Sequence, residues 1–165
     1  MNKILVFLTV VIPIFCSAGS LPDPNLTPGA INLDVTQQNI NETICVPGWT
    51  KTIRPPASYT TKLKIKQLRG DGVYHSDLGA SYFEEDHLIS LELGGHPTDE
   101  RNLWPQPWDS PDGAHEKDVL ENRLKRLVCV GTISLKEAQD AIASDWIAAH
   151  QKYILDARKR RVNAD

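Results

Sequence analysis

An acidic residue and a histidine stand side by side at Asp86 and His87, near the middle of a chain of 165 residues. Asn102 follows fifteen positions after His87, and the pair Gly94-Gly95 lies between them. A neutral imidazole can deprotonate water near pH 7, and a carboxylate can hold a divalent cation. These groups suit hydrolysis of a phosphodiester, which needs an activated water and stabilisation of negative charge. We therefore take His87 as the candidate general base and Asp86 as a candidate metal ligand.

A following helix offers further metal ligands. Residues 113–130 carry apolar side chains at helical spacing, and Gly131 stands where a helix commonly ends. On this helix His115, Asp118 and Asn122 share one polar face, so any of the three could complete a metal site. We rank His115 first and Asn122 second.

The elements that must position these residues follow one another directly. Residues 83–93 form a β-type run interrupted by Gly94-Gly95, and a second short β candidate lies at residues 102–104. The helix at 113–130 comes next. The sequence thus predicts the order strand, loop, strand, helix, with Asp86 and His87 at the end of the first strand and Asn102 opening the second.

In these residues the chain resembles the HNH family of ββα-metal endonucleases. The resemblance rests on Asp86-His87, Gly94-Gly95, Asn102-Leu103 and, less specifically, His115, and it spans about residues 82–124. It implies that Asn102 orients the imidazole of His87 by tethering the loop, with direct contact to the metal as the alternative. The chain departs from the family pattern on the helix, because neither a Cys-x-x-Cys-His ending nor a pair of helix histidines is present.

The resemblance further implies a nuclease with one divalent metal ion, Mg²⁺ in the first place and Mn²⁺, Ni²⁺ or Zn²⁺ as alternatives. The expected partner is nucleic acid, DNA rather than RNA. Because the formal net charge is −3, contacts to phosphate must come from local groups of cations. The candidates are Lys62, Lys64, Lys66, Arg69, Arg123, Lys125 and Arg126. A run of cations at residues 158–161 could also bind phosphate, although it equally suits a solvated helix end.

The N-terminus predicts export. Lys3 precedes an apolar run over residues 4–15, which is too short to span a membrane as a helix, and small residues follow it. We expect a signal peptide at residues 1–18, with a cut after Ala18 or a few residues later; an uncleaved anchor is the alternative. Removing 18 of the 165 residues leaves 147 and changes the formal charge from −3 to −4, because Lys3 is the only charged residue lost. The expected location is secreted or periplasmic.

Cysteine usage agrees with an oxidising compartment. Cys16 leaves with the signal peptide, and Cys45 and Cys129 remain as an even pair. We expect a disulfide between them, with two separate buried thiols as the alternative. Neither lies in a Cys-x-x-Cys pair, which argues against a zinc knuckle or a thioredoxin-like centre.

The remaining pattern predicts one α+β, mainly helical domain at residues 35–165 that contains the ββα motif at about 82–130, after an extended, proline-rich lead-in at 19–34. Further helices are expected at 35–45, at 58–68 with Ser58 as N-cap, and from Ser134 onward, either as one helix or as two with a break near Ser144. Residues 46–57 are expected to form a loop in which Trp49 anchors the chain to the core. Trp104 and Trp108 could stack on bases but suit core or loop anchoring better.

Each of these polar residues taken singly would more often be structural, and their conjunction favours the nuclease. Two other hypotheses remain open. One is a non-catalytic envelope protein that keeps the ββα frame as a scaffold, which the acidic net charge would suit. The other is a phosphodiesterase acting on a substrate other than nucleic acid, because the motif is suited to a phosphodiester and not to a base.

Overall fold

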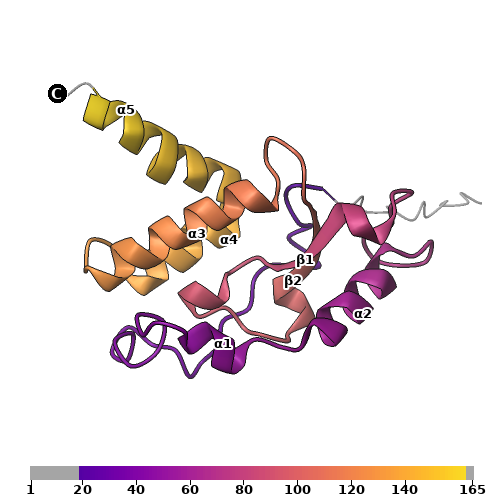
Figure 1. Cartoon of the computed structure of the whole chain (residues 1–165), viewed down its shortest axis with the longest axis horizontal. Helices are drawn as coiled ribbons and strands as arrows, with labels where there is room; N and C mark the ends of the chain where they lie inside the picture. Colours follow the sequence, from indigo (N-terminus) through magenta and orange to yellow (C-terminus); the bar gives the residue numbers. More distant parts are fainter. Residues whose placement is uncertain (1–18, 163–165) are drawn as a thin grey trace, which may run out of the picture.

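The computed structural model describes residues 19–162, with side chains up to Lys159 (Figure 1). The predicted signal peptide, with Cys16, lies outside the described residues. In chain order the elements are α1 (Trp49–Ile53), α2 (Ala57–Leu68), η1 (Ala80–Tyr82), β1 (Phe83–His87), η2 (Leu91–Leu93), η3 (Glu100–Asn102), β2 (Leu103–Pro107), α3 (Ala114–Cys129), α4 (Leu135–His150), η4 (Gln151–Leu155) and α5 (Asp156–Val162). The expected α+β class is confirmed.

The sheet is an antiparallel pair in which Asp86 lies opposite Trp104 and His87 opposite Leu103. Helix α2 packs against both strands, while α3 and α4 lie together on the other side of the hairpin (Figure 1). Strand, loop, strand and helix therefore follow in the predicted order. The strand boundaries differ from the prediction, because β1 ends at His87 and Asn102 closes η3 just before β2 begins.

The main core lies between α3 and α4. It includes Leu120, Leu124 and Val128 from α3, and Ile142 and Trp146 from α4, all almost inaccessible to solvent. This apolar spacing is the one that the sequence showed, and burial of such a stripe is what stabilises an amphipathic helix in a protein.

The start of α4 agrees with the sequence prediction, whereas the start of α2 does not. Ser134 caps α4, with its hydroxyl accepting a hydrogen bond from the backbone N–H of Glu137 at 3.1 Å. Asp145 interrupts α4 with extended backbone and accepts a hydrogen bond from Ala148 N, so the expected break lies one residue after Ser144. The N-cap of α2 is Pro56 instead of Ser58.

Two sequence predictions were wrong before the hairpin. Residues 35–45 form successive turns instead of a helix, because Asn39 bonds through its side chain to Thr36 N and Asp34 O and thereby competes with helical bonding. The segment predicted as loop holds the short helix α1, which follows Gly48 in left-handed conformation (φ 82°). Trp49 is partly buried against the main core, as expected for an anchor.

The proline-rich lead-in, which was expected to be extended, contains a turn at residues 24–26 and lies against the loop between the strands. Gly29 N donates to Arg101 O, Asn32 N to Gly94 O and His96 N to Ala30 O. Near its start, Ser20 O accepts a hydrogen bond from the indole N–H of Trp146 at 2.7 Å. No helix within residues 19–162 is long and apolar enough to cross a membrane.

Cys45 and Cys129 are joined by a disulfide, with their Cα atoms 5.7 Å apart. The bridge connects the turn region before α1 with the end of α3, across 84 positions of sequence. The cysteine pairing predicted from the sequence is therefore present in the structure.

Candidate active site

The imidazole of His87 is held in one tautomer. His87 is 5% exposed, and its Nε2 lies 2.9 Å from the carbonyl oxygen of Pro97. Because a carbonyl can only accept a hydrogen bond, Nε2 carries the proton and Nδ1 keeps its lone pair. Burial lowers the pKa of His87 below its usual value, although the bond to Pro97 and the charge of Asp86 act in the opposite direction. The ring is therefore neutral at pH 7 and able to accept a proton.

Asn102 fastens the loop that carries the Pro97 carbonyl. Its amide is completely buried; Oδ1 accepts from Ile89 N at 2.9 Å, and Nδ2 donates to Ile89 O at 3.0 Å and to His96 O at 3.1 Å. Both polar atoms of the amide bond to backbone groups, so Asn102 holds the loop closed. This is the geometry expected if Asn102 tethers the loop and does not contact a metal directly. Asn102 reaches His87 only indirectly, through the residue next to Pro97.

Gly95 makes this closure possible. A Cβ at Gly95 would lie 1.7 Å from Ile89 O and 2.9 Å from Nδ2 of Asn102, so no residue with a side chain fits there. Gly94 adopts the left-handed conformation (φ 73°) that glycine tolerates best. The Gly-Gly pair thus permits the tight loop that holds His87.

Asp86 and His87 line a small polar pocket of about 60 Å³ between β1, η2 and α3. Other side chains around it are mostly carboxylates and come from both β1 and α3; the lining includes Arg54, Glu84, Glu92, Asp118 and Glu121. Glu84 and Asp86 face the same side of β1 because side chains alternate along a strand. The pocket is therefore an acidic cavity with one histidine and one arginine in its wall.

Burial and neighbouring carboxylates raise the pKa values of two acids in this pocket. Burial, and then the charges of Asp86 and Asp118, raise the pKa of Glu84 to about 7. Burial and the charge of Asp86 also raise the pKa of Asp118. Neighbouring carboxylates add to the effect of burial in both cases, and a bound cation would offset their negative charge.

One buried cation is already paired with carboxylates of this wall. Lys117 is fully buried, and its ammonium donates to Asp86 Oδ2 at 2.8 Å, to the carbonyl of His87 at 2.7 Å and to Glu121 Oε1. The Nζ atom also lies 5.4 Å from the ring centre of Trp104. Burial acts to lower the pKa of Lys117, but the two carboxylates outweigh it and raise the pKa, so the side chain stays charged. Burial raises the pKa of Glu121, and the charge of Asp86 acts in the same direction. Lys117 acts in the opposite direction but does not outweigh burial.

Arg54 brings a second positive charge to the pocket from the residue after α1. The sequence prediction missed it, as it missed Glu84, Lys117 and Glu121. Two sequence patterns could have indicated these residues. Lys117 and Glu121 are four positions apart on a predicted helix, and Glu84 and Asp86 are two positions apart on a predicted strand. Arg54 had none, because only the tertiary fold carries it from a distant segment to the strand.

The structure does not bring the two first-ranked helix ligands to the pocket. His115 is exposed, with its ring centre 5.3 Å from that of Trp108, and Asn122 donates to the backbone carbonyl of Asp118 and lines a different groove. As α3 is seated, Lys117, Asp118 and Glu121 turn toward β1 instead. Of the three candidates from the sequence, Asp118 is the one that lines the pocket together with Asp86.

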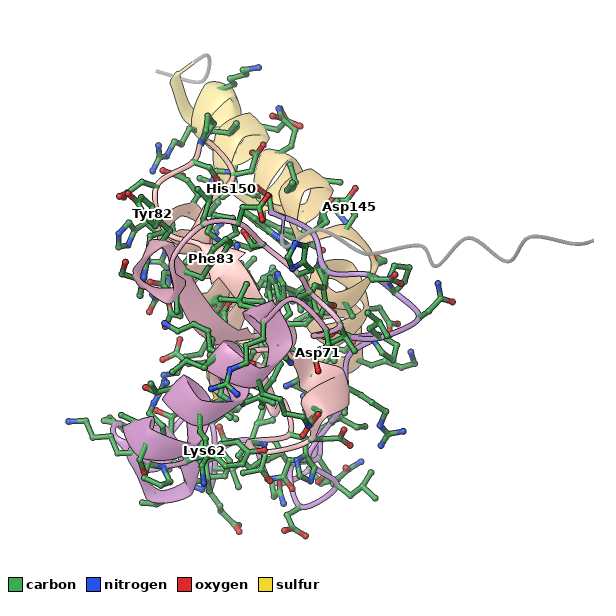
Figure 2. All side chains as sticks on the ribbon, turned by 90° about the vertical axis from the view of Figure 1, so that its right-hand side faces the viewer. Lys62, Asp71, Tyr82, Phe83, Asp145 and His150 are labelled. Atoms are coloured by element: carbon green, nitrogen blue, oxygen red, sulfur yellow. A yellow bond between two sulfur atoms is a disulfide. The ribbon has the colours of Figure 1, made fainter. Side chains whose placement is uncertain are left out.

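The cations predicted to contact phosphate fall into two places. On α2, Lys62 is exposed and projects at the opposite end of the molecule from α5 (Figure 2), whereas Lys64 donates to the carbonyl of Phe83 at 2.6 Å and Lys66 pairs with Glu100. Lys64 thus contacts the backbone of β1 in this structure. On α3, Lys125 pairs with Glu92, while Arg123 and Arg126 line a groove; Arg69 lines a small pocket after α2.

The donor atoms of the pocket are mainly carboxylate oxygens. Among the described side chains, no group of three or more His, Cys, Asp or Glu residues is arranged to hold a metal ion. Asp86 and Asp118 provide oxygen donors from two elements, and Mg²⁺ characteristically takes one or two carboxylates and keeps several waters. The oxygen-rich wall thus fits Mg²⁺ or Mn²⁺ better than Zn²⁺, which requires a fuller set of nitrogen or sulfur ligands.

Comparison with known proteins gives no relative for this chain: no family model, no curated protein and no solved structure matches it.

Proposed function

We propose that this protein is a metal-dependent nuclease that hydrolyses phosphodiester bonds of nucleic acid at the pocket of Asp86 and His87. The observation that carries the proposal is the neutral His87, with its proton fixed on Nε2 by Pro97 and its Nδ1 lone pair retained, in a pocket that Asp86 also lines. This arrangement matches the requirements of a general base for water. The resemblance of the segment to HNH endonucleases points in the same direction.

In this mechanism His87 accepts a proton from the attacking water at Nδ1, and the bond to Pro97 keeps the imidazole aligned. Asp86 and Asp118 would hold one divalent cation, which when bound supplies positive charge to the phosphate and to the leaving oxygen. Arg54, at the other side of the pocket, would attract the anionic substrate and stabilise charge on a non-bridging oxygen. Asn102 and Gly95 act only by keeping the loop closed.

The disulfide supports action outside the cytoplasm, where such bonds persist. Together with the proposed signal peptide, it favours a secreted or periplasmic nuclease.

The direct test is to incubate the purified mature protein with plasmid DNA and with RNA in the presence of Mg²⁺, Mn²⁺, Ni²⁺ or Zn²⁺, with a chelator control. We expect cleavage that the chelator abolishes. His87→Ala should lower the rate by about 10²–10⁴-fold, the usual contribution of a general base, and added imidazole should restore part of it. The matched control is His75→Ala, which removes a histidine from the loop before β1 and should keep the wild-type rate. Equal cleavage by His87→Ala and wild type would exclude His87 as the base.

Asp86 requires a milder change, because removing its carboxylate also unpairs the buried Lys117. Asp86→Asn keeps the shape and should weaken cation affinity, so that activity returns in part at high cation concentration. Circular dichroism and thermal unfolding show whether the variant is folded.

One observation favours the non-catalytic alternative, namely that Lys117 already neutralises Asp86 from within the protein. A wild-type protein that binds cations but cleaves no diester with any of the four metals would support this scaffold. Cleavage of bis(p-nitrophenyl) phosphate without cleavage of DNA or RNA would instead indicate a phosphodiesterase with another substrate.

A further inference from the structure

A second and larger cavity lies on the outer side of α3, where the C-terminal helix passes over it. This groove has a volume of about 560 Å³ and is formed by α3, η4 and α5. Its floor is apolar, with Val119 from α3 and Ile154 and Ala157 from the C-terminal segment. In Figure 1, α5 extends from the end of α4 and projects beyond the body of the domain.

Three guanidinium groups line the groove and none of its lining residues is acidic. Arg123 and Arg126 come from α3, and Arg158 comes from α5. Two separate helices thus direct positive charge into one cavity, although the chain as a whole carries a net charge of −3. Guanidinium groups bind phosphate through paired hydrogen bonds, so the groove is complementary to an anionic backbone.

The shape of the groove depends on an irregular helix. Residues 151–155 form the π-helix η4, which brings Tyr153 and Ile154 to the cavity, and α5 follows without interruption. Tyr153 is fixed there by its hydroxyl, which donates to Glu137 Oε1 at 3.1 Å. Wide helical turns of this kind are rare and frequently occur at functional sites.

Neighbouring residues of α3 line the groove and the candidate active site. Asp118 lines the acidic pocket, and Asn122, one turn later, donates to the carbonyl of Asp118 and lines the groove. Arg126 lies one turn further. From Asp118 to Arg126 the helix rises about 12 Å, which corresponds to roughly four nucleotides of a stacked strand at about 3.4 Å each.

We propose that the groove between α3 and α5 binds the phosphate backbone of the nucleic-acid strand beside the bond that is cleaved. This inference rests on the proposed function. It makes the substrate a polynucleotide that extends at least about four nucleotides from the scissile phosphate, and it assigns Arg158 of α5 to substrate binding together with Arg126.

The first experiment measures binding without catalysis. A fluorescently labelled 12-nucleotide single strand is titrated with wild-type protein in chelator, by anisotropy, at several salt concentrations. Arg126→Ala/Arg158→Ala should bind more weakly, and the slope of log affinity against log salt should decrease by about 1.4, because each phosphate contact to a single strand contributes about 0.7. Arg126→Lys/Arg158→Lys should keep most of the slope.

The matched control is Arg101→Ala/Lys136→Ala, which removes two exposed positive charges that pair with Asp99 and Asp140, away from the groove. It should leave the slope at the wild-type value. Thermal unfolding of all variants confirms that they are folded.

The second experiment measures cleavage against substrate length. With the wild type, kcat/KM should rise from a dinucleotide to strands of eight or more nucleotides, and this rise should be absent in Arg126→Ala/Arg158→Ala. Hydrolysis of bis(p-nitrophenyl) phosphate, which is too short to reach the groove, should be equal in both.

These outcomes separate the two proposals. If the wild type binds the strand through these arginines but cleaves nothing, the groove is a nucleic-acid binding site, and the nuclease proposal and the placement beside a cleaved bond both fail. If the double alanine variant binds with the wild-type slope, the groove inference is overturned whatever the activity. It is also overturned if poly-glutamate binds as tightly as the oligonucleotide with the same dependence on Arg126 and Arg158, because the occupant would then be an acidic protein segment.

Discussion

Glu85 is a buried acid without a hydrogen-bond partner for its side chain. It follows Glu84 on β1 but points to the other face of the strand, and it is 8% exposed with neither carboxylate oxygen hydrogen-bonded. Burial, and then the charge of Asp86, raise its pKa to about 9. Glu85 is therefore protonated at pH 7 in the folded protein, and it lowers the stability at every pH at which the unfolded chain would ionise it.

The first prediction at this scale concerns pH. The folded pKa of Glu85 lies above its unfolded value near 4.5, so the folded state binds more protons between these values and stability must fall as pH rises from about 4.5 to 9. Glu85→Gln keeps the shape without an ionisable group. It should leave the free energy of unfolding nearly unchanged at pH 5 and raise it by roughly 3–5 kcal/mol at pH 8–9, because the unfolded carboxyl group ionises over this range and each pH unit costs about 1.4 kcal/mol.

Urea unfolding at pH 5, 7 and 9 measures this difference. The control is Glu100→Gln, which changes an exposed carboxylate paired with Lys66 and should give no gain at high pH. A stability profile of Glu85→Gln parallel to that of the wild type would show that Glu85 is ionised in the folded protein.

At the scale of elements, Lys117 holds the hairpin to the helix. Its ammonium joins Asp86 and the backbone of His87 on β1 to Glu121 on α3, so the two elements of the candidate site cannot move apart without unpairing a buried charge. These contacts also fix the position of α3 relative to β1, and with it the position of Asp118 relative to Asp86. The lysine is thus a positioning residue for the pocket.

Lys117→Met should lower the free energy of unfolding by about 3–5 kcal/mol, because it leaves two carboxylates buried without their cation. The matched control is Lys125→Met on the same helix. Lys125 pairs with Glu92 at 2.9 Å while remaining about a quarter exposed, so its loss should cost about 1 kcal/mol or less. Chemical denaturation of both variants measures the contrast.

Two further changes test the cause. Adding Asp86→Asn and Glu121→Gln to Lys117→Met removes the unpaired charges and should recover a large part of the lost stability. Equal destabilisation by Lys117→Met and Lys125→Met would mean that the pocket is solvated and that the buried pairs contribute little.

At the scale of the whole molecule, the disulfide closes a covalent loop across 84 positions of the sequence. It ties the turns before α1 to the end of α3, and the main core lies against both segments. In the chain-entropy account, a loop of this length stabilises the folded state by about 4–5 kcal/mol, because the unfolded chain loses conformations.

Cys45→Ala/Cys129→Ala should therefore lower the free energy of unfolding by up to about 4–5 kcal/mol without changing the candidate pocket. Thermal unfolding with and without reductant measures the effect, and the double variant serves as control because it should be insensitive to reductant. Mass spectrometry of the wild type should find two hydrogens fewer than in the reduced chain. Two thiols that can be alkylated without reduction would contradict the bridge.

The sequence by itself determined the features that depend on neighbouring residues. The apolar period of residues 114–129, the Ser134 cap and the order strand, loop, strand, helix are properties of local spacing, and the structure has them. The Gly94-Gly95 pair signalled a tight loop because only glycine permits its backbone approach. Asp86, His87 and Asn102 could be predicted as site candidates because they lie within one short segment.

Tertiary structure decided what fills the pocket. The seating of α3 against β1 turns Asp118 and Lys117 inward and leaves His115 and Asn122 outside, a choice that a helical wheel cannot make because it lacks the position of the strand. Arg54 reaches the same pocket from a segment thirty-two positions before Asp86 in the sequence, and Arg158 meets Arg126 only because the chain returns over α3. Contacts of this kind depend on how elements pack, and packing is a property of the whole chain.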